Sequence, residues 1–151
     1  MRSLLKAEKK KGRLASIINE AGEDGGTPLS VALKNGHTKV AEILLEKGGA
    51  DADHYNAVTG CTPLIVASAI DSLFNAQCLV AKGGADMNKP IASNGATPLS
   101  ICSENNSLRV AQYIIENGAG VNKAANNGAT PLTMSSQEGR QEMVNKWSRN
   151  S

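Results

Sequence analysis

A single tripeptide, Thr-Pro-Leu, recurs four times along the 151-residue chain and limits its fold more than any other feature. The copies begin at Thr27, Thr62, Thr97 and Thr130, so the successive spacings are 35, 35 and 33 residues. A glycine stands two residues before each threonine, and four of the five prolines in the chain belong to the tripeptide. A fixed period of this length predicts a repeat architecture, in which each unit packs against its neighbours and no single central core exists.

The residues of the motif predict a turn followed by the start of a helix. A threonine hydroxyl caps a helix N-terminus well, and proline is favoured at the first helical position, where its missing N–H costs nothing. The leucine then begins the buried side of the helix. The preceding glycine permits a tight turn. Each repeat is therefore expected to open with a turn and a short first helix.

A second helix is expected after a break in each repeat. In the first repeat the break is Asn35-Gly36, and the second helix covers residues 37–47, where Val40, Ile43 and Leu44 follow helical spacing. The third repeat has the same pattern. Glycines then end the second helices, as is common at helix C-termini: Gly48-Gly49, Gly83-Gly84 and Gly118.

The whole unit resembles the ankyrin repeat, which has a 33-residue period and a Thr-Pro-Leu-His-x-Ala signature. The best copy reads GGTPLSVALKNGHTKVAEILLEKGGAD, and the resemblance covers about residues 22–147. It implies an all-α solenoid of stacked helix-turn-helix units joined by β-hairpin-like loops. The implied division is a degenerate N-terminal capping repeat at 1–24, repeats at 25–59, 60–94 and 95–127, and a truncated C-terminal repeat at 128–151.

The two end segments depart most from the pattern. Leu14, Ile17 and Ile18 reproduce part of the spacing of a second helix, and residues 4–7 are interpreted as a first helix paired with it. At the other end, Trp147 falls where Leu44 stands in the first repeat, and the chain stops soon afterwards. Either the last repeat is a stripped cap, or the chain is a fragment of a longer array.

Other departures predict weak points in the second and last repeats. Asn75 stands where the first repeat has Val40, and a buried Asn without a partner costs about 1–3 kcal/mol, which Phe74 is expected to offset by turning inward. The last repeat has Ser135-Ser136 in place of small apolar residues. The family histidine after Thr-Pro-Leu is also missing. The corresponding positions of this chain hold Ser30, Ile65, Ser100 and Thr133. We expect the three polar residues, but not the isoleucine, to replace part of the hydrogen bonding that the histidine provides between loops.

Charge is distributed unevenly along the chain. Residues 1–13 carry six basic side chains against Glu8, a net charge of +5, whereas residues 14–151 carry ten basic and thirteen acidic ones, a net charge of −3. The body therefore offers no basic field for nucleic acid. The basic segment 1–13 is either a solvated face of the cap, or a nuclear-localisation or anionic-surface patch.

The length of the apolar runs and the spacing of the cysteines indicate the cellular compartment of the protein. No apolar run reaches the roughly 18 residues of a transmembrane helix, and no apolar stretch typical of a secretory signal follows the basic start, so membrane insertion and secretion are not expected. The three cysteines are widely spaced without a Cys-x-x-Cys, which is neither a disulfide framework nor a zinc pattern. We expect an intracellular, cytoplasmic protein, with the nucleus as the alternative through segment 1–13.

The sequence contains no convincing catalytic or cofactor site. Cys102 occupies a small-residue position of a first helix, and His37 begins a second helix, so both are interpreted as structural. Asp51 and Asp53 form an acidic pair without further ligands spaced for calcium. We therefore expect no enzyme activity, no cofactor and no bound metal.

The resemblance implies a non-catalytic, monomeric module that binds another protein through a concave surface of first helices and loop tips. Tyr55, Ile70 and Ile91 are the expected apolar anchors. The alternatives are a fragment of a larger multidomain protein whose other domain carries the activity, and an enzyme or small-molecule binder with a deep pocket. The family pattern places these residues of the chain at the partner surface: Lys34, Asn35, His54, Tyr55, Asn56, Ile70, Lys89, Ile91, Glu104, Asn105 and Lys123.

Overall fold

The computed structural model describes residues 2–150, and within them the chain forms helices and loops without a β-strand. Met1 and Ser151, the outer limits of the first and last predicted repeats, lie outside the described residues. Helix α1 (Arg2–Ile17) comes first. The first helices of the repeats are α2 (Pro28–Lys34), α4 (Pro63–Ala69), α6 (Pro98–Asn105) and α8 (Pro131–Gln137). The second helices are α3 (Thr38–Ile43), α5 (Leu73–Gln77), α7 (Leu108–Glu116) and α9 (Gln141–Asn150).

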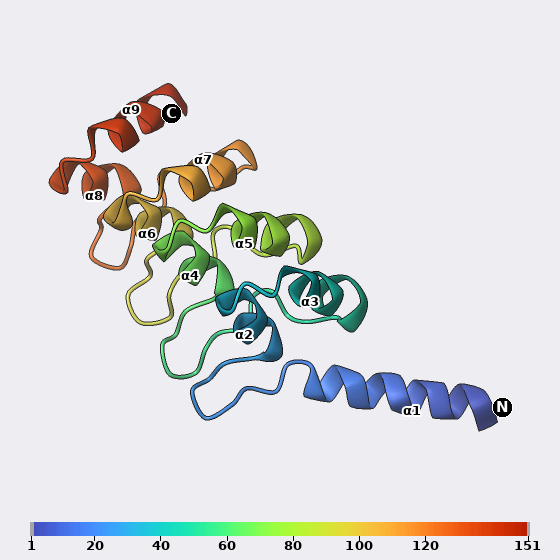
Figure 1. Cartoon of the computed structure of the whole chain (residues 1–151). Coiled ribbons are helices and arrows are strands. Elements are labelled where there is room, and N and C mark those ends of the chain that lie inside the picture. Colours follow the sequence, from blue (N-terminus) through green and yellow to red (C-terminus); the bar gives the residue numbers. More distant parts are fainter. Residues whose placement is uncertain (1, 151) are drawn as a thin grey trace.

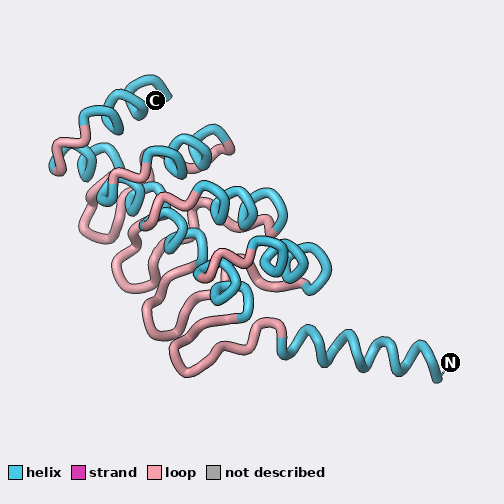
Figure 2. Tube along the Cα trace, in the orientation of Figure 1, coloured by secondary structure: helices cyan, strands magenta, loops and turns pink. Residues whose placement is uncertain are grey.

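The helix pairs stack into an elongated array, as expected for a solenoid. First helices form one row, second helices form another, and the loops project along a third side (Figures 1 and 2). Helix α6 packs between α4 and α8, while α5 packs against α7. Each first helix begins as predicted, with proline at its start and a threonine hydroxyl that accepts a hydrogen bond from the backbone N–H three residues later. The glycine two residues before each threonine has a positive φ, which confirms the tight turn.

The longer spacing of the first two repeats has a local structural cause. Helices α3 and α5 continue into π turns, η1 (Leu44–Gly48) and η2 (Cys78–Lys82), and these end at the doubled glycines. The N–H of Ala50 donates to Leu44 O across six residues, whereas in the third repeat Ala119 donates to Ile114 O across five. One of the two extra residues is thus absorbed as a π turn in the second helix.

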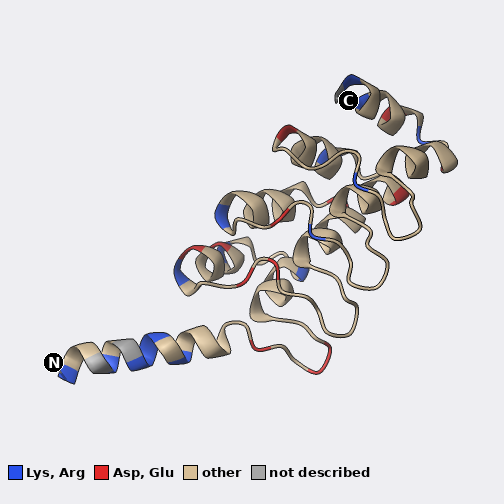
Figure 3. Ribbon diagram, turned by 180° about the vertical axis from the view of Figure 1, so that it is seen from behind, with Lys and Arg blue, Asp and Glu red and all other residues tan. Residues whose placement is uncertain are grey.

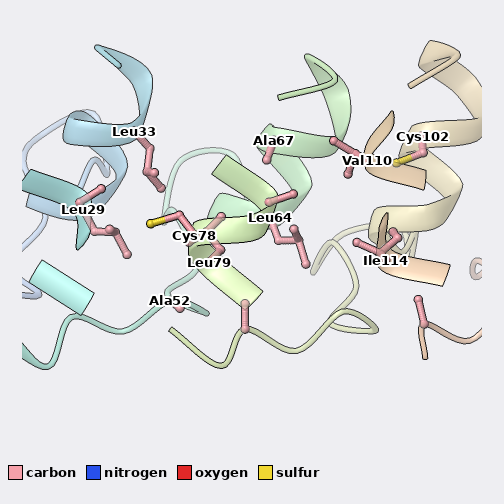
Figure 4. Close-up of a cluster of buried hydrophobic side chains, with 14 of the residues drawn as sticks. Leu29, Leu33, Ala52, Leu64, Ala67, Cys78, Leu79, Cys102, Val110 and Ile114 are labelled. Atoms are coloured by element: carbon pink, nitrogen blue, oxygen red, sulfur yellow. The ribbon is translucent and has the colours of Figure 1, made fainter. Parts of the chain in front are cut away.

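The core is a row of thin layers between repeats. Leu29, Leu64 and Leu99, the leucines of three Thr-Pro-Leu motifs, are fully buried, and one apolar cluster continues from Ile18 to Trp147. Its central part consists of aliphatic side chains, alanines and two cysteines (Figure 4). Aliphatic layers of this kind explain how the chain packs with an aromatic content of only 3%.

The predicted helix pair at the N-terminus is wrong. Residues 2–17 form the single continuous helix α1, which projects away from the stack (Figure 1), and its described side chains are exposed, whereas Ile18 just after it is buried. Because α1 does not cover α3, Val40 is 49% exposed, whereas Val110, its counterpart inside the array, is 0% exposed. Ile43, expected in the buried stripe, is exposed for the same reason.

Two expected weak points are better satisfied than the sequence suggested. Asn75 is buried, but its Nδ2 donates to Leu33 O at 3.4 Å, and Phe74 stays exposed and does not turn inward. Buried Ser135 donates to Pro131 O and accepts a hydrogen bond from Trp147 Nε1 at 3.1 Å. Both polar side chains therefore have partners, so burying them does not carry the cost of an unsatisfied group.

The expected bonding between loops at the missing histidine positions is also wrong. Ser30, Ser100 and Thr133 form hydrogen bonds with the threonine of their own motif, and no bond across to a neighbouring loop is found for them within residues 2–150. Ile65 is buried in a small apolar cluster with Ala96. The polar side chains at these positions therefore strengthen helix starts, and the link between loops comes from other residues.

Asp71 links the second repeat to the third. It stands at the break between α4 and α5 with φ 51°, a backbone conformation that Gly36 adopts in the first repeat. Its carboxylate accepts hydrogen bonds from Arg109 Nε at 2.9 Å and from the Val110 N–H at 3.0 Å, while Arg109 Nη2 donates to its carbonyl oxygen at 2.8 Å. The aspartate thus bonds to the start of α7 in the next repeat.

We expect Asp71→Ala to lower the free energy of unfolding by about 2–3 kcal/mol, because it removes charge-assisted hydrogen bonds and places alanine in a strained conformation. Asp71→Gly, which accepts that conformation without strain, is expected to lose less. Urea unfolding followed by circular dichroism measures both. Stability of the alanine variant within about 0.5 kcal/mol of the wild type contradicts the proposed link.

Candidate functional site

An open groove of about 510 Å³ lies between α2, α4 and the loops that precede them. Three apolar side chains line it and remain accessible: Val31 on α2 is 45% exposed, Val66 on α4 is 49% exposed, and Ile70 just after α4 is 62% exposed. Asp24 and Lys34 add one charge of each sign. The groove therefore combines an apolar surface with a few polar groups, which is the composition of a binding site.

The groove brings together three of the predicted contact residues and includes two that sequence reasoning missed. Ile70, Lys34 and Asn56 line it. Val31 and Val66 line it as well, although the prediction took only the last residues of each first helix. Both stand four residues after the threonine of their motif, where the later repeats have Ile101 and Met134. The recurring apolar residue was a usable signal, but its simplest interpretation is core packing.

Tyr55 and Lys89 connect successive loops. The Tyr55 hydroxyl donates to Pro90 O at 2.9 Å, and Lys89 Nζ lies 4.6 Å from the centre of the Tyr55 ring. Lys89 Nζ also donates to Asp53 O at 2.9 Å. These contacts hold the two loop tips together and leave both side chains half-buried. Their contact with a partner stays a prediction.

The remaining predicted residues divide into those bonded to the fold and those free at the surface. Ile91 packs against the small cluster of Ile65 and Ile101, and His54 borders a shallow hollow beside the groove. The amide groups of three asparagines donate to backbone carbonyls: Asn35 to Val31 O, Asn56 to Asp24 O, and Asn105 to Ile101 O. The exposed polar residues among those predicted are Lys34, Asn35, Glu104, Asn105 and Lys123.

A ladder of side-chain hydrogen bonds holds the loops in register. Each rung joins an Asn or Asp oxygen to a backbone N–H in the next repeat. The rungs are Asn19 to Asp51 at 2.8 Å, Asp53 to Asp86 at 3.0 Å, and Asn88 to Gly120 at 2.7 Å. The Asp51 and Asp53 pair is thus part of this ladder. Within residues 2–150 no group of three or more His, Cys, Asp or Glu side chains is placed to hold a metal ion.

The burial of the cysteines agrees with the interpretation of Cys102 as a small buried residue of a first helix. Cys78 and Cys102 are buried and Cys61 is half-buried, and none of the three forms a disulfide. Desolvation by burial raises the pKa of Cys102 to about 12. Because the thiolate is the reactive form, a raised pKa makes this side chain a poor nucleophile at neutral pH.

We expect a thiol reagent at about pH 8 to modify Cys61 in the folded protein and to reach Cys78 and Cys102 only after unfolding. The measurement is absorbance during reaction with a disulfide reagent, with and without urea. Cys61→Ser serves as the control and should abolish the reaction of the folded protein. Rapid modification of Cys102 in the folded state contradicts its assignment as a buried, inert thiol.

Comparison with known proteins agrees with this geometry. A family model described as ankyrin repeats, in three copies, matches residues 2–91 and 71–146. A search of the curated proteins finds no match. None of the helices between residues 2 and 150 has the length and apolar character needed to cross a bilayer. Ankyrin repeats are in general protein–protein interaction modules and are typically non-catalytic. The stacked helix pairs and the matched family model show that the chain belongs to the ankyrin repeat family.

Proposed function

We propose that the chain is a non-catalytic module that binds another protein in the groove between α2 and α4. The observation that carries this proposal is the convergence of Val31, Val66 and Ile70 on one open groove. Single exposed apolar residues are common on protein surfaces, but several that share a groove are typical of an interaction site. The partner is expected to insert apolar side chains there.

The rigidity of the surroundings supports the same proposal. Val31 and Val66 lie within helices, and the hydrogen-bonded loop ladder fixes the loops beside them. A surface that is already ordered loses little conformational entropy when a partner binds. The exposed residues Glu104, Asn105 and Lys123 would extend the contact along the array, with charges at the edge of the interface.

The three unpaired thiols suit a reducing compartment, so we also propose an intracellular location. Cytoplasm is the proposed compartment, and the nucleus is the alternative through segment 1–13. A fluorescent fusion of the full chain distinguishes the two.

A capture experiment with matched variants tests the binding proposal. We expect a partner protein to be retained from an extract by the wild type and by Ile43→Asp, and to be lost with Val66→Asp. Both variants place a carboxylate at a half-exposed apolar position, but Ile43 lies on α3, in the row of second helices. Equal retention by all three proteins counts against the groove as the binding site.

A further inference from the structure

Helix α1 extends from the array as a free arm. It runs continuously from Arg2 to Ile17 and projects beyond the helix pairs (Figure 1). Its C-terminal end is fixed to the first repeat, because Ile18 is buried and Asn19 Oδ1 accepts a hydrogen bond from the Asp51 N–H at 2.8 Å. The arm is therefore held at one end, and the side chains that the structure describes along the rest of it are exposed.

One side of this arm carries an apolar strip with a cationic border. Ala7, Leu14 and Ile17 line the strip, and Lys10, Lys11 and Arg13 border it. Leu14 and Ile17 are each 47% exposed, so nothing in residues 2–150 covers them fully. At 3.6 residues per turn, Leu14 and Ile17 are neighbours on this side of the helix, while Ala7 lies two turns before Leu14 with Lys10 and Lys11 in the turn between them.

The arm carries a concentrated positive charge, six of the sixteen Lys and Arg residues of the chain. Its sequence holds six Lys and Arg residues and one Glu, whereas residues 14–151 have a net charge of −3. Figure 3 shows the basic residues following α1, while acidic residues are scattered over the helices and loops of the array. The charge of the arm therefore favours an anionic partner.

We propose that α1 binds the surface of membranes that contain anionic phospholipid. A helix with an apolar strip and basic neighbours lies in the plane of the headgroups, where its apolar side chains enter the acyl boundary and its cations meet phosphate and carboxylate groups. The long stems of Lys and Arg let the charged ends stay at headgroup level. The helix rests on the bilayer and does not cross it.

The apolar strip favours a lipid surface over nucleic acid. A nucleic acid backbone would satisfy the cations of the arm, but it would leave Leu14 and Ile17 without an apolar contact. A bilayer satisfies both kinds of side chain at once. The arm would then tether the array to the membrane and leave the groove between α2 and α4 open to a protein.

Vesicle cosedimentation of the full chain tests the proposal. The vesicles are phosphatidylcholine alone, or phosphatidylcholine with about one third phosphatidylserine. We expect binding to the anionic vesicles to be at least about tenfold stronger, and to weaken as salt screens the charges. Equal binding to both vesicles, or none to the anionic ones, overturns the proposal.

Paired variants separate the contribution of the cations to vesicle binding from that of the apolar side chains. Replacing Lys10 and Arg13 by Gln, or Leu14 and Ile17 by Ser, should each weaken anionic-vesicle binding at least about tenfold. These side chains are exposed, so the fold is expected to persist, and the helical circular dichroism signal of each variant checks it. The control, Lys123→Gln with Val58→Ser, changes an exposed cation and an exposed apolar residue of the loops and should bind like the wild type.

Two further outcomes have definite meanings. Full binding by the serine variant shows simple charge adsorption and overturns the role of the apolar strip. Binding to a duplex oligonucleotide but not to anionic vesicles assigns the arm to nucleic acid and overturns the proposal. Val66→Asp, which alters only the groove, should leave vesicle binding unchanged, so this test and that of the binding groove are independent.

Discussion

Replacing Leu64 by alanine is expected to lower the free energy of unfolding by about 2–5 kcal/mol. Leu64 is 0% exposed and lies in the buried layer near Leu79 (Figure 4). Truncation removes its apolar contacts and leaves a cavity that neighbouring repeats, held by their own helix pairs, fill only in part. A loss of this size is a large fraction of the stability of a typical domain.

The last motif of the chain provides a matched control. Leu132 holds the same place after its threonine as Leu64 does, but it is 40% exposed because the described residues leave that side of α8 uncovered. We expect Leu132→Ala to cost less than about 1 kcal/mol. Urea unfolding by circular dichroism measures both variants. Equal losses at the two positions contradict a core made of layers between repeats.

The second large expected effect is a loss of partner affinity when residues of the binding groove are replaced. We expect Val66→Asp combined with Ile70→Asp to weaken partner affinity by at least about a hundredfold, because each change buries an unpaired carboxylate at an apolar contact. Both side chains are half-exposed or more in the free protein, so the cost falls on the complex and only weakly on folding.

The apolar anchors predicted from the sequence lead to a different expectation. If Tyr55 and Ile91 contact the partner directly, Tyr55→Ala combined with Ile91→Ala should weaken partner binding at least about tenfold. In the structure Tyr55 bonds to the neighbouring loop and Ile91 packs in a small apolar cluster, so this pair also tests loop integrity. Circular dichroism of the double variant distinguishes a folding defect from a direct loss of contact.

The parts of the fold that local chemistry decides were predictable from sequence. A threonine hydroxyl caps the nearest backbone N–H groups, and proline fixes the first helical residue, so each first helix begins where the motif places it. The same holds for the small-residue position of Cys102, which is buried like Ala67 at the equivalent place in the preceding repeat.

Features that depend on packing between repeats were not predictable in this way. Leu14 and Ile17 have the spacing of a second helix, but no first helix forms beside them, so α1 stays undocked and Val40 is exposed. Val31 and Val66 have the pattern of core residues. Their exposure depends on how far α2 and α4 stand apart, a distance that no local sequence rule specifies.

The most direct test of the proposed function is the dissociation constant of the captured partner, measured by titration calorimetry for the wild type, Val66→Asp and Ile43→Asp. The three proteins should share one circular dichroism spectrum. We expect Val66→Asp to raise the dissociation constant at least about tenfold and Ile43→Asp to leave it within about twofold. An unchanged constant for Val66→Asp, or an equal rise for both variants, contradicts binding in the groove between α2 and α4.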